Sequence, residues 1–155
     1  MAAGSEDPAF RAYARSALAA FHDYRGRLDD SRHLLNQVRR EDVAGLVSPL
    51  PQAFHLFIIA DHALRRAGDR AEGLEATRTA LTAVAATGIR IWKVTTLFHG
   101  VLLCLAVGDR TGARVFLDRL APLLNEDRPV DAAGWYAAQA WYDLAQGRPN
   151  DAVTR

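Results

Sequence analysis

The side chains best suited to chemistry in this chain are five histidines. They are His22, His33, His55, His62 and His99. Zinc sites favour closely spaced histidine pairs such as H-x3-H, and no such pair occurs here. His55 and His62 are seven residues apart, two turns along one helix face, so a metal site would also need His99 and a carboxylate such as Asp61. We therefore predict no metal site and interpret the histidines as surface or groove residues with ordinary partners.

Other catalytic signatures are missing from the sequence. It contains no G-x-x-x-x-G-K-[ST] phosphate loop, no G-x-G-x-x-G after a strand, and no strained turn that would expose a nucleophilic serine. Cys104 lies in the apolar run VLLCLAV, where burial suppresses the reactive thiolate, so we assign it to the core. The sequence thus predicts no catalytic residue, no cofactor and no enzymatic activity.

The composition is that of a balanced globular chain. Its 155 residues include 19 Lys and Arg against 18 Asp and Glu, a net charge of +1. Nucleic-acid binding normally requires a basic face, so direct binding to nucleic acid is not expected. No run of 18 apolar residues indicates a membrane span, and the N-terminus lacks a secretory pattern. With a single cysteine and no export signal, we predict a cytoplasmic protein.

Apolar residues recur with the 3.6-residue period of amphipathic helices along the chain. We interpret Met1–Glu6 as a disordered lead or a tag remnant, and residues 7–155 as one helical domain whose first helix begins at Asp7-Pro8 and ends near Gly26. Glu41–Pro51, rich in proline and glycine, is predicted to be the longest connection. The other predicted helices are Asp29–Arg40, Gln52–Ala67, Ala71–Ala86, Ile89–Val107, Thr111–Leu124 and Asp131–Gln146. Gly88 is predicted to end the third of these in the left-handed conformation, and Pro122 to kink or finish the last turn of the fifth.

Four turn glycines divide this pattern into repeats. Gly26, Gly68, Gly108 and Gly147 are 42, 40 and 39 residues apart, and the triplet GDR stands at both central turns. Five residues after each glycine is a small residue, as close packing of two helices requires. These are Ser31, Gly73, Ala113 and Ala152. The spacing predicts an array of helix pairs, the last of which is truncated within the fourth repeat.

The segments LRRAGDRAEGLEATRTAL, LAVGDRTGARVFLDRL and LAQGRPNDA resemble tetratricopeptide repeats, with a glycine turn followed by the small residue of the second helix. The repeats are longer than 34 residues and lack the full tetratricopeptide signature, so they are more similar to the sensor repeats of MalT-like and SARP-type bacterial signal-transduction ATPases. The resemblance implies an all-α, right-handed αα-superhelix of about three and a half helix pairs.

In tetratricopeptide arrays the first helix of each pair lines a concave groove, which implies a ligand-binding surface here. Its polar part would bind through Arg65 and Arg66, which could receive a carboxylate. The alternative is a solvated inner face on which Asp23 pairs with Arg65. The implied lining residues are Tyr13, Ser16, Asp23, Tyr24, His55, Ile58, His62, Arg65, Arg66, Thr95, Phe98, Leu102, Trp141 and Leu144.

A second aromatic group consists of Trp135-Tyr136 and Trp141-Tyr142. These four side chains cannot share one helix face. We interpret them as packing surface between repeats, left partly bare by truncation, rather than as a dedicated aromatic binding site. This interpretation predicts self-association through the C-terminal end.

The resemblance implies a non-catalytic sensor or protein-interaction segment of a larger regulator, which binds a protein, a peptide or a small-molecule inducer in its groove. The alternative is a free-standing adaptor that binds a peptide tail of a chaperone, secretion or signalling partner. A DNA-binding helix-turn-helix is disfavoured, because the second helices carry acids such as Glu72, Glu75 and Asp118.

Overall fold

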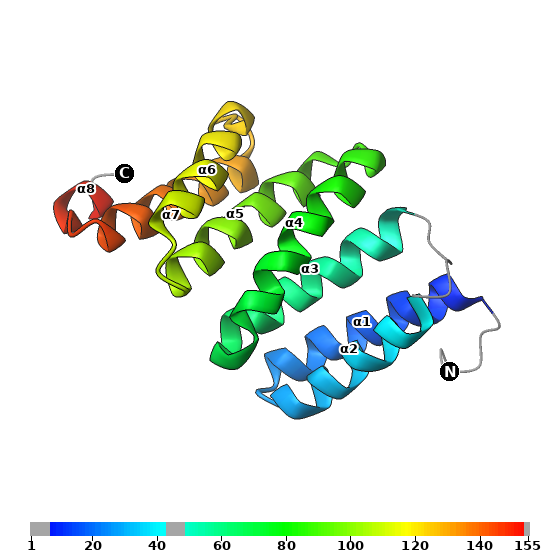
Figure 1. Cartoon of the computed structure of the whole chain (residues 1–155). Helices are drawn as coiled ribbons and strands as arrows, with labels where there is room; N and C mark the ends of the chain where they lie inside the picture. The colour runs from blue at the N-terminus through cyan, green and yellow to red at the C-terminus, as the bar shows by residue number, and fades with distance from the viewer. Residues whose placement is uncertain (1–6, 43–48, 154–155) are drawn as a thin grey trace. The chain divides into compact units, whose positions relative to one another are not determined.

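The computed structural model describes residues 7–42 and 49–153, and every regular element in these two ranges is helical (Figure 1). This confirms the all-α prediction. Within the same ranges, no helix is both long and apolar enough to cross a membrane. The α-helices are α1 (Pro8–Tyr24), α2 (Leu28–Asp42), α3 (Pro49–Arg65), α4 (Arg70–Thr87), α5 (Arg90–Ala106), α6 (Arg110–Leu120), α7 (Pro129–Ala145) and α8 (Pro149–Val153).

Two of the residues predicted to begin or end helices do so in the structure. Asp7 caps α1, because its side chain accepts a hydrogen bond from the backbone N–H of Ala9 at 2.9 Å. Gly88 follows α4 with a φ of 67°, in the left-handed conformation that ends a helix without a steric penalty. Both predictions are confirmed.

Two predicted boundaries are wrong, and proline explains both. Pro49 and Pro51 were assigned to the connection Glu41–Pro51, but they form the first turn of α3, where a missing N–H costs nothing. The rest of that connection, residues 43–48, lies outside the described residues. The helix predicted to reach Leu124 ends at Leu120. Pro122 falls in the 3₁₀ turn Ala121–Leu123, which confirms the prediction that its ring can finish the last turn.

The chain divides into two compact units, Met1–Gly88 and Ile89–Arg155. In the first unit, α1 packs on α2, α3 packs on α4, and α1 also contacts α3. In the second unit, α5 packs on α6, α7 packs on α8, and α5 also contacts α7. Each unit therefore contains two helix pairs in sequence order, as the glycine spacing predicts. The assignment of residues 7–155 to a single domain stays a prediction.

The four turn glycines do not behave alike. Gly26, Gly108 and Gly147 have φ angles of 73°, 80° and 73°. After each of them, the next residue donates its N–H to a carbonyl five residues back, the Schellman pattern of helix ends. Gly68 has no positive φ and lies in the 3₁₀ turn Ala67–Asp69 instead. One of the four repeat turns thus has a different geometry.

The small residues that follow these turns lie at helix contacts. Ser31, Gly73 and Ala113 are all buried, and Ala152 is half-buried. Their short side chains let the second helix of each pair approach the first closely. The packing role predicted for this position is confirmed at three of the four repeats.

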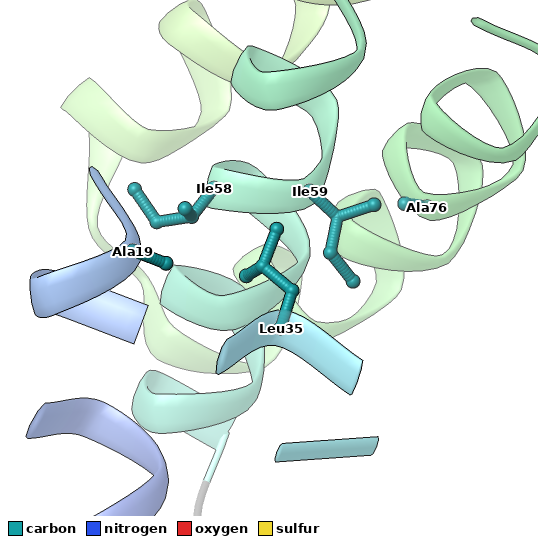
Figure 2. Close-up of a cluster of buried hydrophobic side chains, with 5 residues drawn as sticks. All are labelled: Ala19, Leu35, Ile58, Ile59 and Ala76. Atoms are coloured by element: carbon teal, nitrogen blue, oxygen red, sulfur yellow. The ribbon is translucent and has the colours of Figure 1, made fainter. Parts of the chain in front are cut away.

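The core of the first unit joins its four helices. Figure 2 shows Leu35 of α2 reaching between Ile58 and Ile59 of α3, with Ala19 of α1 on one side and Ala76 of α4 on the other. All five are at most 6% exposed. A buried aliphatic side chain stabilises a fold by about 2 kcal/mol, so this cluster holds the first unit together.

The core of the second unit is centred on α5. Leu97, Val101, Leu103 and Cys104 are fully buried, and Phe116 of α6, which packs on α5, is 5% exposed. Within the run VLLCLAV, Val101, Leu103 and Cys104 belong to the core while Val107 is 45% exposed, and the assignment of Cys104 to the core is confirmed.

We expect Cys104 to react with a thiol reagent such as DTNB at least about 100-fold more slowly in the native protein than in urea, because the sulfur is exposed only when α5 separates from α6. Absorbance at 412 nm measures the rate, and the single cysteine makes the signal unambiguous. Complete reaction within the mixing time under native conditions would contradict the burial of this helix.

Candidate functional site

The polar residues of the candidate site lie where α1 and α3 run side by side (Figure 1). Ser16 and Asp23 are seven residues apart on α1, and His55 and His62 are seven apart on α3. Seven residues make two helical turns, so each pair shares one face. The two faces meet, and Ser16 and Asp23 each form a hydrogen bond with a histidine 39 residues further along the chain.

Asp23 and His62 form a buried pair. His62 Nδ1 lies 2.7 Å from Asp23 Oδ1, and their side chains are 1% and 0% exposed. An ionised carboxylate only accepts hydrogen bonds, so the imidazole Nδ1 is the donor. This fixes the histidine ring and satisfies one oxygen of a carboxylate that water does not reach.

Ser16 and His55 form a second buried pair one step earlier along both helices. The Ser16 hydroxyl donates to the backbone carbonyl of Ala12 at 2.9 Å. It therefore accepts from His55 Nδ1, 3.0 Å away. His55 is 2% exposed and Ser16 is fully buried, so this contact is also internal.

The other side of His62 faces the turn at Gly68. Nε2 of His62 lies 3.3 Å from Oδ2 of Asp69, and the guanidinium groups of Arg32 and Arg66 each lie 3.7 Å from the same oxygen. Arg32 also pairs with Glu72 of α4 at 2.6 Å. The polar cluster therefore connects all four helices of the first unit.

The aspartates of the two GDR triplets have different structural roles. Asp109 caps α6, because its side chain accepts from the N–H of Gly112 at 2.8 Å. Asp69 makes no capping hydrogen bond and faces His62 instead. The 3₁₀ geometry at Gly68 thus accompanies an aspartate that belongs to the polar cluster.

Five of the predicted groove residues lie inside the first unit. Each is at most 4% exposed, so none of them offers its side chain to a ligand in this structure. The alternative of an Asp23–Arg65 pair on a solvated inner face is also wrong: Asp23 binds His62, and Arg65 binds Asp61 one turn earlier on its own helix, at 3.2 Å. The five buried residues are Ser16, Asp23, His55, Ile58 and His62.

The other predicted residues of the first unit are accessible. Tyr24 is 85% exposed, and the Arg65 guanidinium lies 5.6 Å from the centre of its ring. Tyr13 is 44% exposed and its ring lies 4.7 Å from that of Phe54. Arg66 pairs with Asp29 at 2.6 Å. The Tyr24–Arg65 pair, a cation resting on an aromatic face, is the most open of these features.

The predicted residues of the second unit are described separately. Trp141 and Leu144 of α7 are 55% and 47% exposed, whereas Phe98 and Leu102 of α5 are half-buried. The Phe98 ring lies 6.1 Å from that of His99. The Thr95 hydroxyl donates to the Ile91 carbonyl of its own helix at 2.9 Å, so its donor is used within the helix and does not indicate a ligand-binding site.

The aromatic residues around Trp141 differ in exposure. Trp135, Tyr136 and Tyr142 are half-buried, and the Tyr136 hydroxyl donates to Glu126 at 3.1 Å. Only Trp141 of these four side chains is openly exposed. This division agrees with the geometric argument that the four cannot share one face.

Sequence reasoning missed the polar bridge of the second unit. Arg90 Nε donates to Oδ2 of Asp131, which is 4% exposed, at 2.8 Å, and Arg90 also donates to the carbonyl of Leu123. These residues begin α5 and α7, next to a shallow hollow of about 290 Å³. A repeat alignment shows the signal: Arg90 and Asp131 are 41 residues apart, close to the repeat length.

The second internal carboxylate of this unit is Asp143, which is 1% exposed. It accepts hydrogen bonds from Gln139 at 3.1 Å and from Arg148 at 2.6 Å, which ties the end of α7 to α8. No group of three or more His, Cys, Asp or Glu side chains in the described ranges is arranged to hold a metal ion.

In comparisons with known proteins, no family model, no curated protein and no solved structure matches the chain.

Proposed function

We propose that the chain is a non-catalytic sensor and protein-interaction segment of a larger cytoplasmic bacterial regulator of transcription, built as a right-handed superhelix of helix pairs. The support is the resemblance of its glycine turns to tetratricopeptide repeats, together with the sequential pairing of α1 with α2, α3 with α4, α5 with α6 and α7 with α8. In such arrays each repeat contacts only its neighbours, so a ligand bound at one pair can shift the packing of the next.

The observation that carries the proposal is the Tyr24–Arg65 pair. Asp23, His55 and His62 are buried inside the unit and Arg66 pairs with Asp29, whereas Tyr24 is 85% exposed beside the Arg65 guanidinium. Arginine stacked on an aromatic ring and aimed at solvent is a common receptor for carboxylates. The partner would thus bind through an acidic side chain or a free carboxylate.

The present partner of Arg65 does not prevent this binding. Asp61 is four residues away on the same helix, and surface pairs of that kind contribute only about 0.3–0.5 kcal/mol. A ligand carboxylate that forms a bidentate hydrogen bond can therefore replace Asp61 at little cost. The Tyr24 ring holds the guanidinium in place and reduces the entropy lost on binding.

We expect Arg65→Ala to weaken binding of a tetraglutamate peptide about tenfold, the loss of one charge-assisted hydrogen bond. The measurement is a titration of the ¹⁵N-labelled chain followed by NMR, in which the Tyr24 amide and the Arg65 Nε–H signals should shift in the wild type.

The matched control is Arg114→Ala. Arg114 also pairs with a carboxylate four residues away on a helix surface, at 2.8 Å, and the hydrogen bond and charge of Asp118 raise the pKa of the Arg114 guanidinium. Its removal should leave the affinity unchanged. Equal loss in the two variants, or no saturable shift at Tyr24, would refute a carboxylate site at Arg65.

The coding sequence around this segment separates the regulator from the free-standing adaptor. A phosphate loop and a DNA-binding domain encoded upstream in the same reading frame would support the regulator. A stop codon immediately after Arg155 would contradict it and favour the adaptor, which can use the same Tyr24–Arg65 pair.

A further inference from the structure

The side of α1 turned away from its own unit is apolar. Ser16, Ala19 and Asp23 form the buried side that faces α2 and α3. On the opposite side, Phe10, Leu18 and Phe21 are 49%, 47% and 51% exposed. Isolated exposed apolar residues are ordinary, but a row along a whole helix marks an interaction surface. We call this surface the α1 outer face and define it as Phe10, Ala14, Ala17, Leu18 and Phe21.

The spacing along this face suits a second helix. Phe10, Ala14, Ala17 and Phe21 follow one another at intervals of four, three and four residues, the pattern of a seam between two packed helices. The large rings stand at the two ends and the small alanines lie in the middle. Small side chains at the centre let two helix backbones approach closely, while the rings fill the wider space towards the ends.

The order of these residues is symmetric about the middle of α1. If a second α1 lies antiparallel on the first, Phe10 meets the partner's Phe21, and Ala14 meets the partner's Ala17. The same contacts then form twice, as in an isologous two-fold interface. A size pattern that reads the same in both directions is the signature of a surface that fits a second copy of itself.

The charges at the two ends of α1 fit the same arrangement. Asp7 is exposed at the N-terminal end, and Arg25 is exposed at the C-terminal end, with its guanidinium 5.5 Å from the centre of the Phe21 ring. In the antiparallel pair each Asp7 lies close to the partner's Arg25. Opposite charges therefore meet at both ends, and the helix dipoles are antiparallel.

We propose that the chain forms a two-fold dimer in which the outer faces of two α1 helices pack antiparallel. Phe10 packs against the partner's Phe21, the alanines lie at the crossing, and Asp7 pairs with the partner's Arg25. A dimer presents two Tyr24–Arg65 pairs, so a partner with two acidic segments would bind more tightly than one with a single segment.

The test is sedimentation velocity of the full chain over a range of micromolar concentrations. We expect a monomer–dimer equilibrium whose dissociation constant rises at least about tenfold in Phe21→Ser, because the aromatic contact between Phe21 and the partner's Phe10 is lost at both ends of the interface. Val115→Ser is the matched control: Val115 is 54% exposed on α6, outside every binding surface predicted here, and its replacement should leave the equilibrium unchanged.

Charge reversal distinguishes this interface from general hydrophobic association. Arg25→Asp should weaken the dimer, whereas Arg25→Lys, which keeps the positive charge beside the partner's Asp7, should not. Asp7 itself stays in place because it caps α1, and circular dichroism checks that α1 remains folded. A strictly monomeric wild type overturns the proposal, as does a dimer that Trp141→Ser disrupts and Phe21→Ser does not. Neither result bears on tetraglutamate binding at Arg65, so the proposed function is tested separately.

Discussion

Replacing His62 with leucine should lower the free energy of unfolding of the first unit by about 4 kcal/mol, because the Asp23 carboxylate is then buried without its imidazole donor. Asp23 and His62 have side chains that are 0% and 1% exposed, so water cannot take the place of the lost partner. Leucine fills much of the imidazole volume, which keeps the cavity contribution small. Urea unfolding followed by far-UV circular dichroism measures the change.

The double variant Asp23→Leu with His62→Leu separates pairing from packing. Removing both polar partners leaves no unpaired buried carboxylate. The double variant should therefore lose clearly less free energy of unfolding than the two single variants lose in sum. His33→Leu is the control, since His33 is an exposed residue that contacts Gln37 and should change stability by less than about 0.5 kcal/mol. Additive losses in the double variant would show that the two side chains do not act as a pair.

Gly100→Val should destabilise the second unit by about 3 kcal/mol through overpacking. A Cβ atom at Gly100 would come within 3.0 Å of three atoms of the Phe116 ring, which is itself 5% exposed and has little room to move. All three tryptophans, Trp92, Trp135 and Trp141, belong to this unit. Tryptophan fluorescence during urea unfolding therefore follows the affected unit directly.

A smaller side chain at position 116 should relieve the clash. In the Gly100→Val background, Phe116→Leu should cost less than it does in the wild type, with a coupling of at least about 1 kcal/mol. Gly68→Ala is the control glycine, because Gly68 has no atom within 4 Å of its Cβ position and no positive φ. Its unit holds no tryptophan, so far-UV circular dichroism follows this variant. If Gly100→Val left the fluorescence transition unchanged, the close approach of α5 and α6 at this residue would be disproved.

The helices could be predicted from the sequence because their signals are local. The cap at Asp7, the left-handed Gly88 and the small residues after the turns act within a few residues of their positions. The two GDR triplets mark the limit of this reasoning. Asp109 and Asp69 have the same neighbours in sequence, but one caps its own helix and the other faces His62, and only tertiary packing decides between these roles.

Only part of the candidate site can be predicted from the sequence, because its contacts depend on tertiary packing. The tetratricopeptide resemblance assigns Ser16 and Asp23 to the same surface as His55 and His62, and these four side chains do lie together between α1 and α3. The sequence does not tell which side chain on the facing helix each one contacts, so the alternative of a solvated face pairs Asp23 with Arg65 in place of His62. Burial also could not be deduced, because a buried polar residue with a partner has the same sequence pattern as a solvated one.

The two hydrogen-bonded pairs between α1 and α3 also set the register of these helices. Ser16 meets His55 and Asp23 meets His62, so α1 and α3 run in the same direction with matching seven-residue intervals. Sliding α1 by one turn, about 5.4 Å, would break both pairs at once and offer no new partners at the same height. The two pairs thus hold α1 in a single register, so α1 is either packed in that position or fully detached from α3. The backbone amides of α1 should accordingly exchange with solvent in one common opening event rather than turn by turn.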